Sequence, residues 1–499
     1  MYHYTQKSKR GNLYSAFVET AELNAERIFV SDGICQLSYL DALSEVNSIS
    51  AFMKIQYMAG KGSKVGILIS NRVEFVVTVL AINKLGASFV PINKMAKEQD
   101  INDIVNSIGI ELLIYEEKFE AVVSKTFNCI TAGIKELFGS GTDIINDNAK
   151  FDNTSTYQDV ACIFLTSGTT GKPKGAMLGN DTFFSSSRVI SVGSGYKEGM
   201  SQLVVSPLYH IFPFHNQIAP GILLGHTIHL LNYESVGQIM QVMDKNAIEI
   251  ILAAPPIYSL MLMSGLCGIY KLPNAKIFGY SGAPMNENII VSLQKVYPHV
   301  KMVNSYGATE AGGTFAVLPP EEALKRPQSV GVPGEGVDIK VIDEENRFVV
   351  NKMGEILVKN SYMKGYINGN EKSKFFGGYL RTGDVGLIDC EGYVYINGRV
   401  DDMMIVNGTN IYPADVEKYF SDYNLIGGIV VLARKSIFGD QIVAFVESVH
   451  EKEEIYKKLV DFAENNIPEY KRPIDYIFIE KIPRSAAGKI LRKELEDLL

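Results

Sequence analysis

Several features that the sequence lacks exclude classes of protein. Its five cysteines are scattered over 499 residues and form no Cys-x-x-Cys pair, which argues against a metal cluster and against a disulfide framework. No run approaches the roughly 18 uninterrupted apolar residues of a membrane span. The first residues also lack the apolar core of a signal peptide. We therefore expect a cytoplasmic protein with reduced thiols and no membrane span.

Positive charge is also limited, since 48 Lys and Arg residues face 56 Asp and Glu residues, for a formal net charge of -8 at pH 7. Such a chain has no general attraction for nucleic acid or for an anionic membrane, and we predict no nucleic-acid partner. Its composition is 46% hydrophobic, which is typical of a globular protein. The length exceeds that of one ordinary core, so two or more domains are expected.

Strand-like apolar runs alternate with helical patterns through the first three hundred residues. Lys64–Ser70 and Ala87–Pro91 are typical of buried parallel strands, and apolar residues recur at helical spacing over Glu74–Leu85 between them. This alternation indicates parallel sheets covered by helices. Further strands are expected at Glu111–Tyr115, Gln202–Ser206, Thr227–Leu231, Ile248–Ala253, Lys276–Tyr280 and Lys301–Asn304.

The pattern changes twice in the second half of the chain. From about Val337, short strands alternate with glycine turns, which indicates a small β-rich subdomain. A second change at Gly398–Asp402 predicts a domain boundary, with one domain over 1–398 and another, of viable size, over 399–499. The strands of the β-rich part are expected at Asp338–Ile342, Gly354–Lys359, Val385–Ile388 and Tyr393–Ile396.

The most informative stretch is Leu165–Leu178, where a strand-like run enters a loop of glycine, hydroxyl and lysine residues. Glycines let backbone N–H groups approach an anion, and hydroxyls and lysines add donors and positive charge. The loop is not a Walker A loop, because Gly168 and Gly171 enclose only two residues and Pro173 follows Lys172, so we expect no strand-to-helix cradle. The predicted polyphosphate-binding residues are Thr166, Ser167, Gly168, Thr169, Thr170, Gly171, Lys172 and Lys174.

This loop resembles the nucleotide loop of the adenylate-forming superfamily, which includes acyl-CoA synthetases, the adenylation domains of peptide synthetases and firefly luciferase. Later segments match the family in the same order, and the resemblance spans nearly the whole chain. The matching segments are Tyr280–Met285, Tyr306–Glu310, Tyr379–Asp384, Gly398–Asp402 and Pro483–Arg492.

The resemblance implies roles for the residues of the nucleotide site. Thr309 would contact a phosphate and Glu310 would bind Mg²⁺, because this hard cation prefers carboxylate and phosphate oxygens. Tyr306 would stack near the adenine, and Asp384 would hold the ribose hydroxyls, which a carboxylate accepts well. The remaining nucleotide contacts implied are Gly282, Ala283, Pro284 and Arg399.

The resemblance also implies a moving C-terminal domain. Asp401 occupies the hinge position, about which the small domain swings between two half-reactions. Lys489 matches the catalytic lysine that reaches the carboxylate and the α-phosphate. Two anions repel as they react, and a cation between them stabilises the transition state.

The fold class implied is α/β: a large N-terminal domain of two parallel helix-covered sheets plus a β-barrel-like subdomain, with a small mobile α+β C-terminal domain. In the reaction implied, a carboxylate attacks the α-phosphate of Mg-ATP to give an acyl-adenylate and pyrophosphate, and a thiol then releases AMP. This predicts an AMP-forming acid–thiol ligase that uses ATP, Mg²⁺ and coenzyme A. The alternative acceptor is the phosphopantetheine arm of an acyl or peptidyl carrier protein.

The segment Pro207–Phe212 bears on the acid. Amino-acid-activating relatives place an aspartate near this point, whereas Tyr209 and His210 stand here. A buried ammonium without a charge partner would be costly, so we predict an acid lacking an α-amine, with a fatty acid favoured over an aryl acid. His210 is a further candidate of the catalytic site, as a gate or pocket wall without a proton-transfer role, and ordinary packing is its alternative.

Two other points stay open. The candidate acyl-pocket residues are equally suited to core packing. The rival functions are a nucleotide-binding scaffold without catalysis and a luciferase-type oxygenase. The pocket candidates are Phe212, His215, Pro255, Pro256, Tyr258 and Tyr280.

Overall fold

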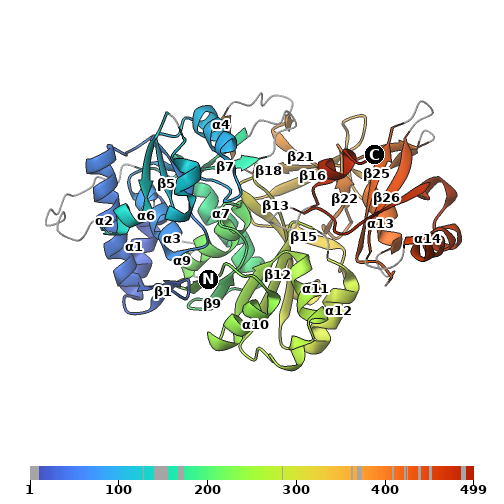
Figure 1. Cartoon of the computed structure of the whole chain (residues 1–499), viewed down its shortest axis with the longest axis horizontal. Helices are drawn as coiled ribbons and strands as arrows, with labels where there is room; N and C mark the ends of the chain where they lie inside the picture. The colour runs from blue at the N-terminus through green and yellow to red at the C-terminus, as the bar shows by residue number, and fades with distance from the viewer. Residues whose placement is uncertain are drawn as a thin grey trace.

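The computed structural model shows an elongated chain, with the blue-to-green first part at one end and the red C-terminal part at the other (Figure 1). Yellow and orange strands lie between these two parts. The structure describes residues 11–126, 128–139, 155–166, 174–283, 285–360, 363–367, 374–406, 409–420, 423, 425–435, 440–448, 452–484 and 490–499.

The first sheet has seven strands in the order β19-β8-β7-β4-β3-β5-β6. Its strands from β7 to β6 pair in parallel, whereas β8 and β19 add two antiparallel strands beyond β7. The bounds are β3 Lys64–Leu68, β4 Ser88–Pro91, β5 Leu112–Tyr115, β6 Ile130–Gly133, β7 Val160–Thr166, β8 Lys174–Gly179 and β19 Met363–Ile367.

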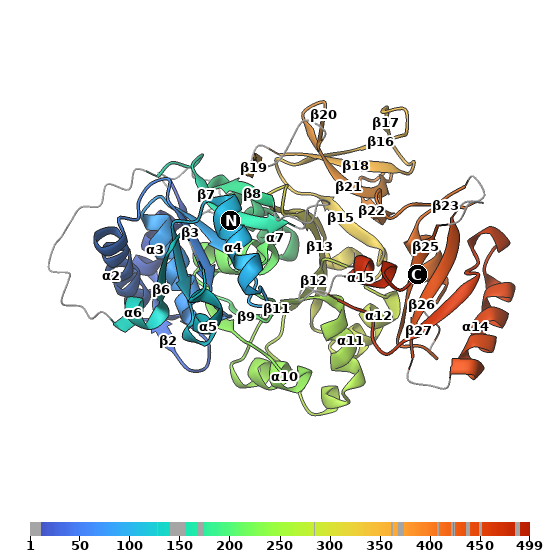
Figure 2. The same ribbon diagram turned by 45° about the horizontal axis from the view of Figure 1, so that its top comes forward.

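The second sheet follows the path β17-β16-β18-β21-β22-β15-β14-β13-β12-β11-β9-β10-β1-β2, with β20 paired to β21. It is parallel from β1 to β13 and antiparallel from β13 to β17, so the predicted β-rich part continues the hydrogen bonding of the parallel part. Figure 2 shows the orange strands of this part as a group of their own. The bounds are β1 Ile28–Ser31, β2 Gln36–Ser38, β9 Ser201–Val204, β10 Thr227–Leu230, β11 Ile250–Ala253, β12 Ile277–Ser281, β13 Lys301–Ala308, β14 Gly313–Leu318, β15 Ser329–Pro333, β16 Asp338–Ile342, β17 Phe348–Val349, β18 Gly354–Lys359, β20 Phe375–Phe376, β21 Tyr379–Ile388 and β22 Val394–Arg399.

One core cluster joins the two sheets. It contains Phe29 and Ile228 from the second sheet together with Phe89 and Phe164 from the first. The helix α3, Val73–Lys84, lies in this cluster and is buried along nearly its whole length, as expected of a helix with little polar face. The other helices are α1 Leu13–Leu23, α2 Tyr39–Tyr57, α4 Glu98–Ile108, α5 Glu120–Val123, α6 Ile134–Gly139, α7 Asp181–Ser194, α8 Ile211–Pro213, α9 Ala219–Leu224, α10 Val236–Lys245, α11 Pro255–Met263 and α12 Glu287–Val296.

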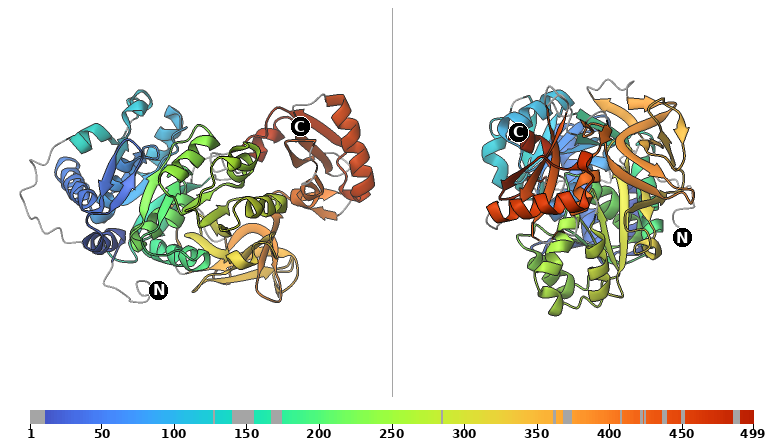
Figure 3. Two further views of the ribbon diagram at one scale, coloured as in Figure 1. Left: turned by 90° about the horizontal axis from the view of Figure 1, so that it is seen from below. Right: turned by 90° about the vertical axis from the view of Figure 1, so that its right-hand side faces the viewer.

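The C-terminal part has a sheet of its own, β25-β26-β27. Side chains alternate along its strands: Val431 packs in a cluster with Leu459 of α14, whereas Val430 and Leu432 pack in a cluster with Leu495 of α15. In Figures 2 and 3, α14 lies along the outer side of this sheet. The bounds are β23 Met404–Val406, β24 Thr409–Ile411, α13 Pro413–Glu417, β25 Gly428–Arg434, β26 Gln441–Glu447, α14 Lys452–Asn466, β27 Asp475–Ile479 and α15 Arg492–Glu496.

The predicted α/β fold class is confirmed, and most strand and helix patterns lie where the sequence placed them, shifted by a few residues at their ends; the strand predicted at Val385–Ile388 is the last part of the longer β21. Strands β16 and β18 have the predicted bounds. Strand β13 runs four residues further than the apolar run that predicted it, into the Tyr306 segment. Among the described residues, no helix is long and apolar enough to cross a membrane.

Candidate active site

Three predicted nucleotide-site residues are bonded to one another. The Tyr306 hydroxyl donates to Asp384 Oδ2 at 2.6 Å, and Arg399 Nη1 donates to Asp384 Oδ1 at 2.8 Å. Asp384 is 9% exposed. Each carboxylate oxygen has two acceptor positions, so both can accept a further hydroxyl hydrogen bond.

Strand register explains this arrangement. Asp384 on β21 and Arg399 on β22 are directly opposite each other in an antiparallel pair, which brings side chains within contact distance. Tyr306 comes from β13, on the other side of β14 and β15 in the sheet order. Burial, together with the Asp384 carboxylate, raises the pKa of Tyr306 well above its ordinary value, so the hydroxyl keeps its proton and donates.

The residue after Tyr306 has to be glycine. A Cβ atom at Gly307 would overlap the carbonyl oxygen of Gly313 on the neighbouring strand β14, at a point where the strand register shifts. Because only backbone fits here, β13 and β14 approach closely at this point. Gly307 and Gly313 both line the pocket found there.

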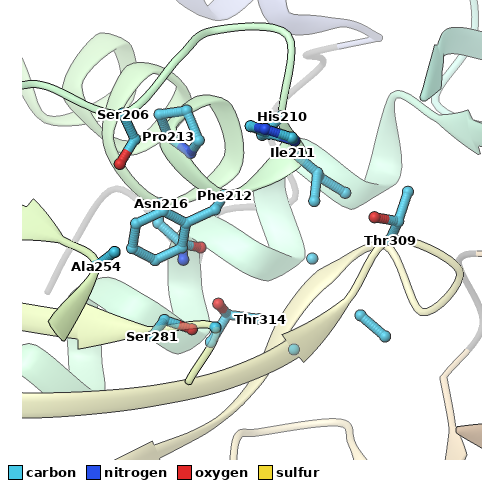
Figure 4. A pocket seen from close by; sticks show the side chains of 14 residues that line it. Ser206, His210, Ile211, Phe212, Pro213, Asn216, Ala254, Ser281, Thr309 and Thr314 are labelled. Carbon is cyan, nitrogen blue, oxygen red and sulfur yellow. The ribbon is translucent and has the colours of Figure 1, made fainter. Parts of the chain in front are cut away.

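This pocket lies between the 206–216 segment and strands β11 to β14 (Figure 4). It brings together His210, Gly282 and Thr309, which the sequence had predicted separately for the acyl, adenine and phosphate regions. Gly307 is the neighbour of Tyr306, so β13 connects this pocket to the Asp384 cluster. The full lining is Ser206, His210, Ile211, Phe212, Pro213, Asn216, Ala254, Ser281, Gly282, Gly307, Ala308, Thr309, Gly313 and Thr314.

His210 stands on a loop held in place by a residue that the sequence did not single out. Asn71, which is 4% exposed, donates to the carbonyl oxygen of Ser206 at 2.9 Å and accepts from the backbone N–H of Leu208 at 3.0 Å. The ring of His210 packs on that of Tyr209 with centroids 4.5 Å apart. Burial lowers the pKa of His210 to about 4, so its ring is neutral at pH 7 and suits a pocket wall.

Glu310 has the properties that a magnesium ligand requires. It is half-buried, stands in the turn after β13 beside Thr309, and has no ion-pair partner among the described residues. Nor do those residues contain a group of three or more His, Cys, Asp or Glu side chains placed to hold a metal. One carboxylate is what Mg²⁺ needs from the protein when phosphates supply other oxygens, so Glu310 fits a nucleotide-bound ion.

The predicted phosphate loop joins two strands. Thr166 ends β7, Lys174 begins β8, and the two are opposite each other in an antiparallel pair. The next described element after β7 is the strand β8. Thr166 and Lys174 are not among the lining residues of the pocket. The predicted residues Ser167–Lys172, Pro284 and Lys489 lie outside the described residues.

Of the six candidate acyl-pocket residues, only Phe212 lines the pocket. Tyr258 and Tyr280 are fully buried in a core cluster, and the Tyr258 hydroxyl donates to the carbonyl oxygen of Gly279 at 2.6 Å. His215 is also fully buried, and its Nε2 lies 3.1 Å from Thr182 Oγ1. Packing, which the sequence left open, accounts for these residues.

The sequence analysis missed Asn216, although it lies four residues after Phe212, a spacing that places two side chains on one helical face. These residues span α8 and η3, where residues 214–218 form a π-helical turn. Such turns occur frequently at functional sites. The four-residue spacing from Phe212 could have pointed to Asn216. The π-helical turn itself could not be predicted from that spacing.

The fold is that of an α/β protein in which residues predicted for the nucleotide site are bonded to one another, and comparison with known proteins places it further. Residues 17–367 match the AMP-binding enzyme family. The match covers more than half of the chain, so this protein belongs to that family, and the predicted resemblance to adenylate-forming enzymes is confirmed.

Individual relatives agree with this assignment. The chain is 28% identical over 455 residues to the long-chain-fatty-acid–CoA ligase FadD13 of Mycobacterium tuberculosis, covering 88% of each chain. It is 27% identical over 476 residues to the fatty acid–[acyl-carrier-protein] ligase ScoC of Streptomyces coeruleorubidus, covering 92% of this chain and 91% of that one. The fold matches that of the o-succinylbenzoate CoA synthetase of Bacillus subtilis, solved with its acyl-adenylate, with a TM-score of 0.86, 24% identity and 98% coverage of both chains.

Proposed function

We propose that this protein is an AMP-forming acid–thiol ligase that activates a carboxylic acid with ATP and passes the acyl group to coenzyme A. The observation that carries the proposal is the bonded group of Tyr306, Asp384 and Arg399 beside a pocket lined by His210 and Thr309. This arrangement supports a ribose anchor at Asp384 next to a space for an acid. The family match and the relatives named as CoA ligases support the same reaction.

In the first step, the carboxylate oxygen of the acid attacks the α-phosphorus of ATP, and the bond to pyrophosphate breaks. Asp384 holds the ribose hydroxyls, while Thr309 and the loop after β7 contact the phosphates. Mg²⁺ held at Glu310 would neutralise phosphate charge. Lys489 stabilises the charge that develops between the two anions. In the second step, a thiol sulfur attacks the acyl carbon, and AMP leaves.

Two features of the pocket bear on the acid. None of its described lining residues is Asp or Glu, which supports an acid without an α-amine, because a buried ammonium would have no charge partner. Its volume is about 140 Å³, similar to an apolar cavity of ~150 Å³ that binds benzene. The sequence favoured a fatty acid over an aryl acid. Part of that volume adjoins Gly282 and Thr309, which are assigned to the nucleotide, so the space left beside His210 and Phe212 supports a compact tail, which is a short chain or a ring.

A two-domain arrangement is part of the proposal, with residues 1–398 and 399–499 as the domains and a hinge near Asp401. The two core clusters of the C-terminal part contain no residue before Met404. Asp401 itself is exposed. Among the described side-chain contacts that bridge the boundary, Asn397 Nδ2 donates to Asp415 Oδ1 at 3.0 Å, and Arg399 donates to Asp384 directly beside the boundary. A boundary with an exposed hinge and few side-chain bonds supports rotation of the small domain.

The test is pyrophosphate release from Mg-ATP with a panel of short, long and aryl acids, each beside its α-amino counterpart. We expect release with acids that lack the amine, followed by thioester formation when coenzyme A is added. A carrier protein bearing phosphopantetheine is the second acceptor to supply, because one relative is named for such a protein. If no acid of the panel supports pyrophosphate release, the ligase proposal is wrong. A preference for the α-amino acids would contradict the pocket assignment.

A further inference from the structure

Two polar side chains that line the acyl pocket each contain a buried atom without a hydrogen-bond partner among the described residues. Asn216 is 1% exposed, and its Oδ1 accepts from none of the residues that the structure describes. His210 Nε2 is likewise unpartnered within the described part of the chain. Figure 4 shows Asn216 beside the Phe212 ring, on the same segment as His210. Because buried polar atoms are nearly always hydrogen-bonded, these two indicate a ligand group that completes them.

The backbone around Asn216 is well anchored, so the unpartnered Oδ1 does not reflect a loose segment. Its carbonyl oxygen accepts from the Tyr196 hydroxyl at 3.4 Å. The next residue, Gln217, donates from Nε2 to the carbonyl oxygen of Leu203 at 2.8 Å and accepts at its backbone oxygen from Gln202 Nε2 at 2.8 Å. The π-helical turn thus fixes Gln217 to the sheet and leaves the Asn216 amide at the pocket.

The residues that line the pocket restrict the charge of the ligand group that would bond Asn216. Of the lining side chains that the structure describes, none is Asp, Glu, Lys or Arg, and His210 is neutral at pH 7. A second carboxylate or an ammonium in this pocket would have no counter-charge and would be costly to desolvate. A hydroxyl is neutral, donates its hydrogen to an amide oxygen and accepts from an imidazole N–H.

We infer that the acid carries a neutral hydroxyl on a compact tail, and that Asn216 is the residue that selects it. This inference rests on the proposed ligase function and names its substrate class. The hydroxyl donates its hydrogen to Asn216 Oδ1, the buried acceptor that has no partner among the described residues. An acid without the hydroxyl leaves the buried amide oxygen unsatisfied in the complex, which lowers its affinity.

The experiment measures kcat/KM for pyrophosphate release with matched acids: hexanoic, 6-hydroxyhexanoic and adipic acid, and 3-phenylpropanoic acid with its ring-hydroxylated forms. For at least one pair, we expect the wild-type protein to favour the hydroxylated acid by ~10-fold or more. The Asn216→Leu variant, which keeps the branched shape and removes the acceptor, should lose this preference while the KM for ATP is unchanged. Thr182→Val is the control, because Thr182 is a buried polar residue bonded to His215 and is not among the lining residues.

The outcomes separate this inference from the proposed function. If no acid supports pyrophosphate release, the ligase proposal fails and the inference falls with it. If acids are activated but the wild-type protein treats every pair alike, or favours adipic acid, the inference alone is wrong. If Asn216→Leu does not fold, the comparison of hydroxylated and unhydroxylated acids with the wild-type protein still tests the inference. A preference that survives in folded Asn216→Leu, or that is lost equally in Thr182→Val, removes the role of Asn216.

Discussion

The Tyr306 hydroxyl donates a hydrogen bond of 2.6 Å to Asp384, which joins the proposed adenine-stacking residue to the proposed ribose anchor across 78 positions of sequence. The same carboxylate accepts from Arg399 at 2.8 Å. A charge-assisted pair of this kind fixes the carboxylate in one orientation. We therefore propose that ring and carboxylate form one preorganised surface for a nucleoside.

Tyr306→Phe removes that hydrogen bond and keeps the ring. Hydrogen bonds to charged groups contribute about 1.5–3 kcal/mol, so we expect the KM for ATP to rise by ~10-fold or more while the KM for the acid changes little. The control is Tyr379→Phe, because the Tyr379 hydroxyl makes a similar bond of 2.5 Å to Asp338, outside the pocket. An unchanged KM for ATP in Tyr306→Phe, or an equal rise in Tyr379→Phe, would contradict the assignment.

Lys489→Ala should abolish adenylation and spare thioester formation from a supplied acyl-adenylate. The reason is that the proposed role of Lys489 is confined to the first half-reaction, where one preorganised charged donor is worth at least ~10²-fold. ATP–pyrophosphate exchange measures the first step, and thioester formation measures the second. Lys493→Ala, at an exposed lysine four residues further on, is the control. Near-normal exchange in Lys489→Ala would refute the role.

Asp401→Pro tests the hinge. Proline fixes φ near -65° and resists the rotation that a moving C-terminal domain requires. We expect adenylate formation to survive better than thioester formation, with Asp401→Ala close to wild type in both. The two half-reactions are measured separately, as for Lys489. Equal losses in both half-reactions would indicate misfolding rather than a locked hinge.

His226 predicts a pH dependence of stability. Burial lowers its pKa to about 4, against 6.5 for an ordinary histidine, and its Nε2 lies 2.8 Å from the carbonyl oxygen of Lys197. Between these two pH values the unfolded chain binds a proton that the folded chain excludes. The stability present above pH 6.5 is therefore lost as the pH falls towards 4, by up to about 3 kcal/mol from this residue.

His226→Gln keeps a donor for the Lys197 carbonyl and removes the titrating group. Its free energy of unfolding should fall less steeply between pH 6.5 and 4 than that of the wild-type protein. Denaturant unfolding at a series of pH values measures both slopes. His215, whose pKa burial lowers to about 3, leaves a residual slope in the variant. Parallel curves for the two proteins would show that His226 is not the source.

Part of the candidate site followed from local sequence. The Tyr306–Glu310 and Tyr379–Asp384 segments were recognised because their residue types are set by what they would bind, and the chemistry of a carboxylate or a small residue does not depend on its neighbours. Strands β16 and β18 were placed correctly because their apolar alternation and flanking turns are local signals. The antiparallel strands β8 and β19 were not foreseen, because each is short and contains glycine, which weakens the local signal of a strand.

The sequence by itself determined the fold class, the family and the residue types of the nucleotide site, since hydrophobic periodicity and motif spacing are properties of neighbouring residues. Only the tertiary structure decided which side chains meet. It set Asp384 opposite Arg399 through strand register, and it turned His215 and Tyr258 into the core while Asn216 stayed at the pocket. Register and burial depend on elements far apart in the chain, because each side chain takes the position where its apolar surface and its hydrogen bonds are satisfied together.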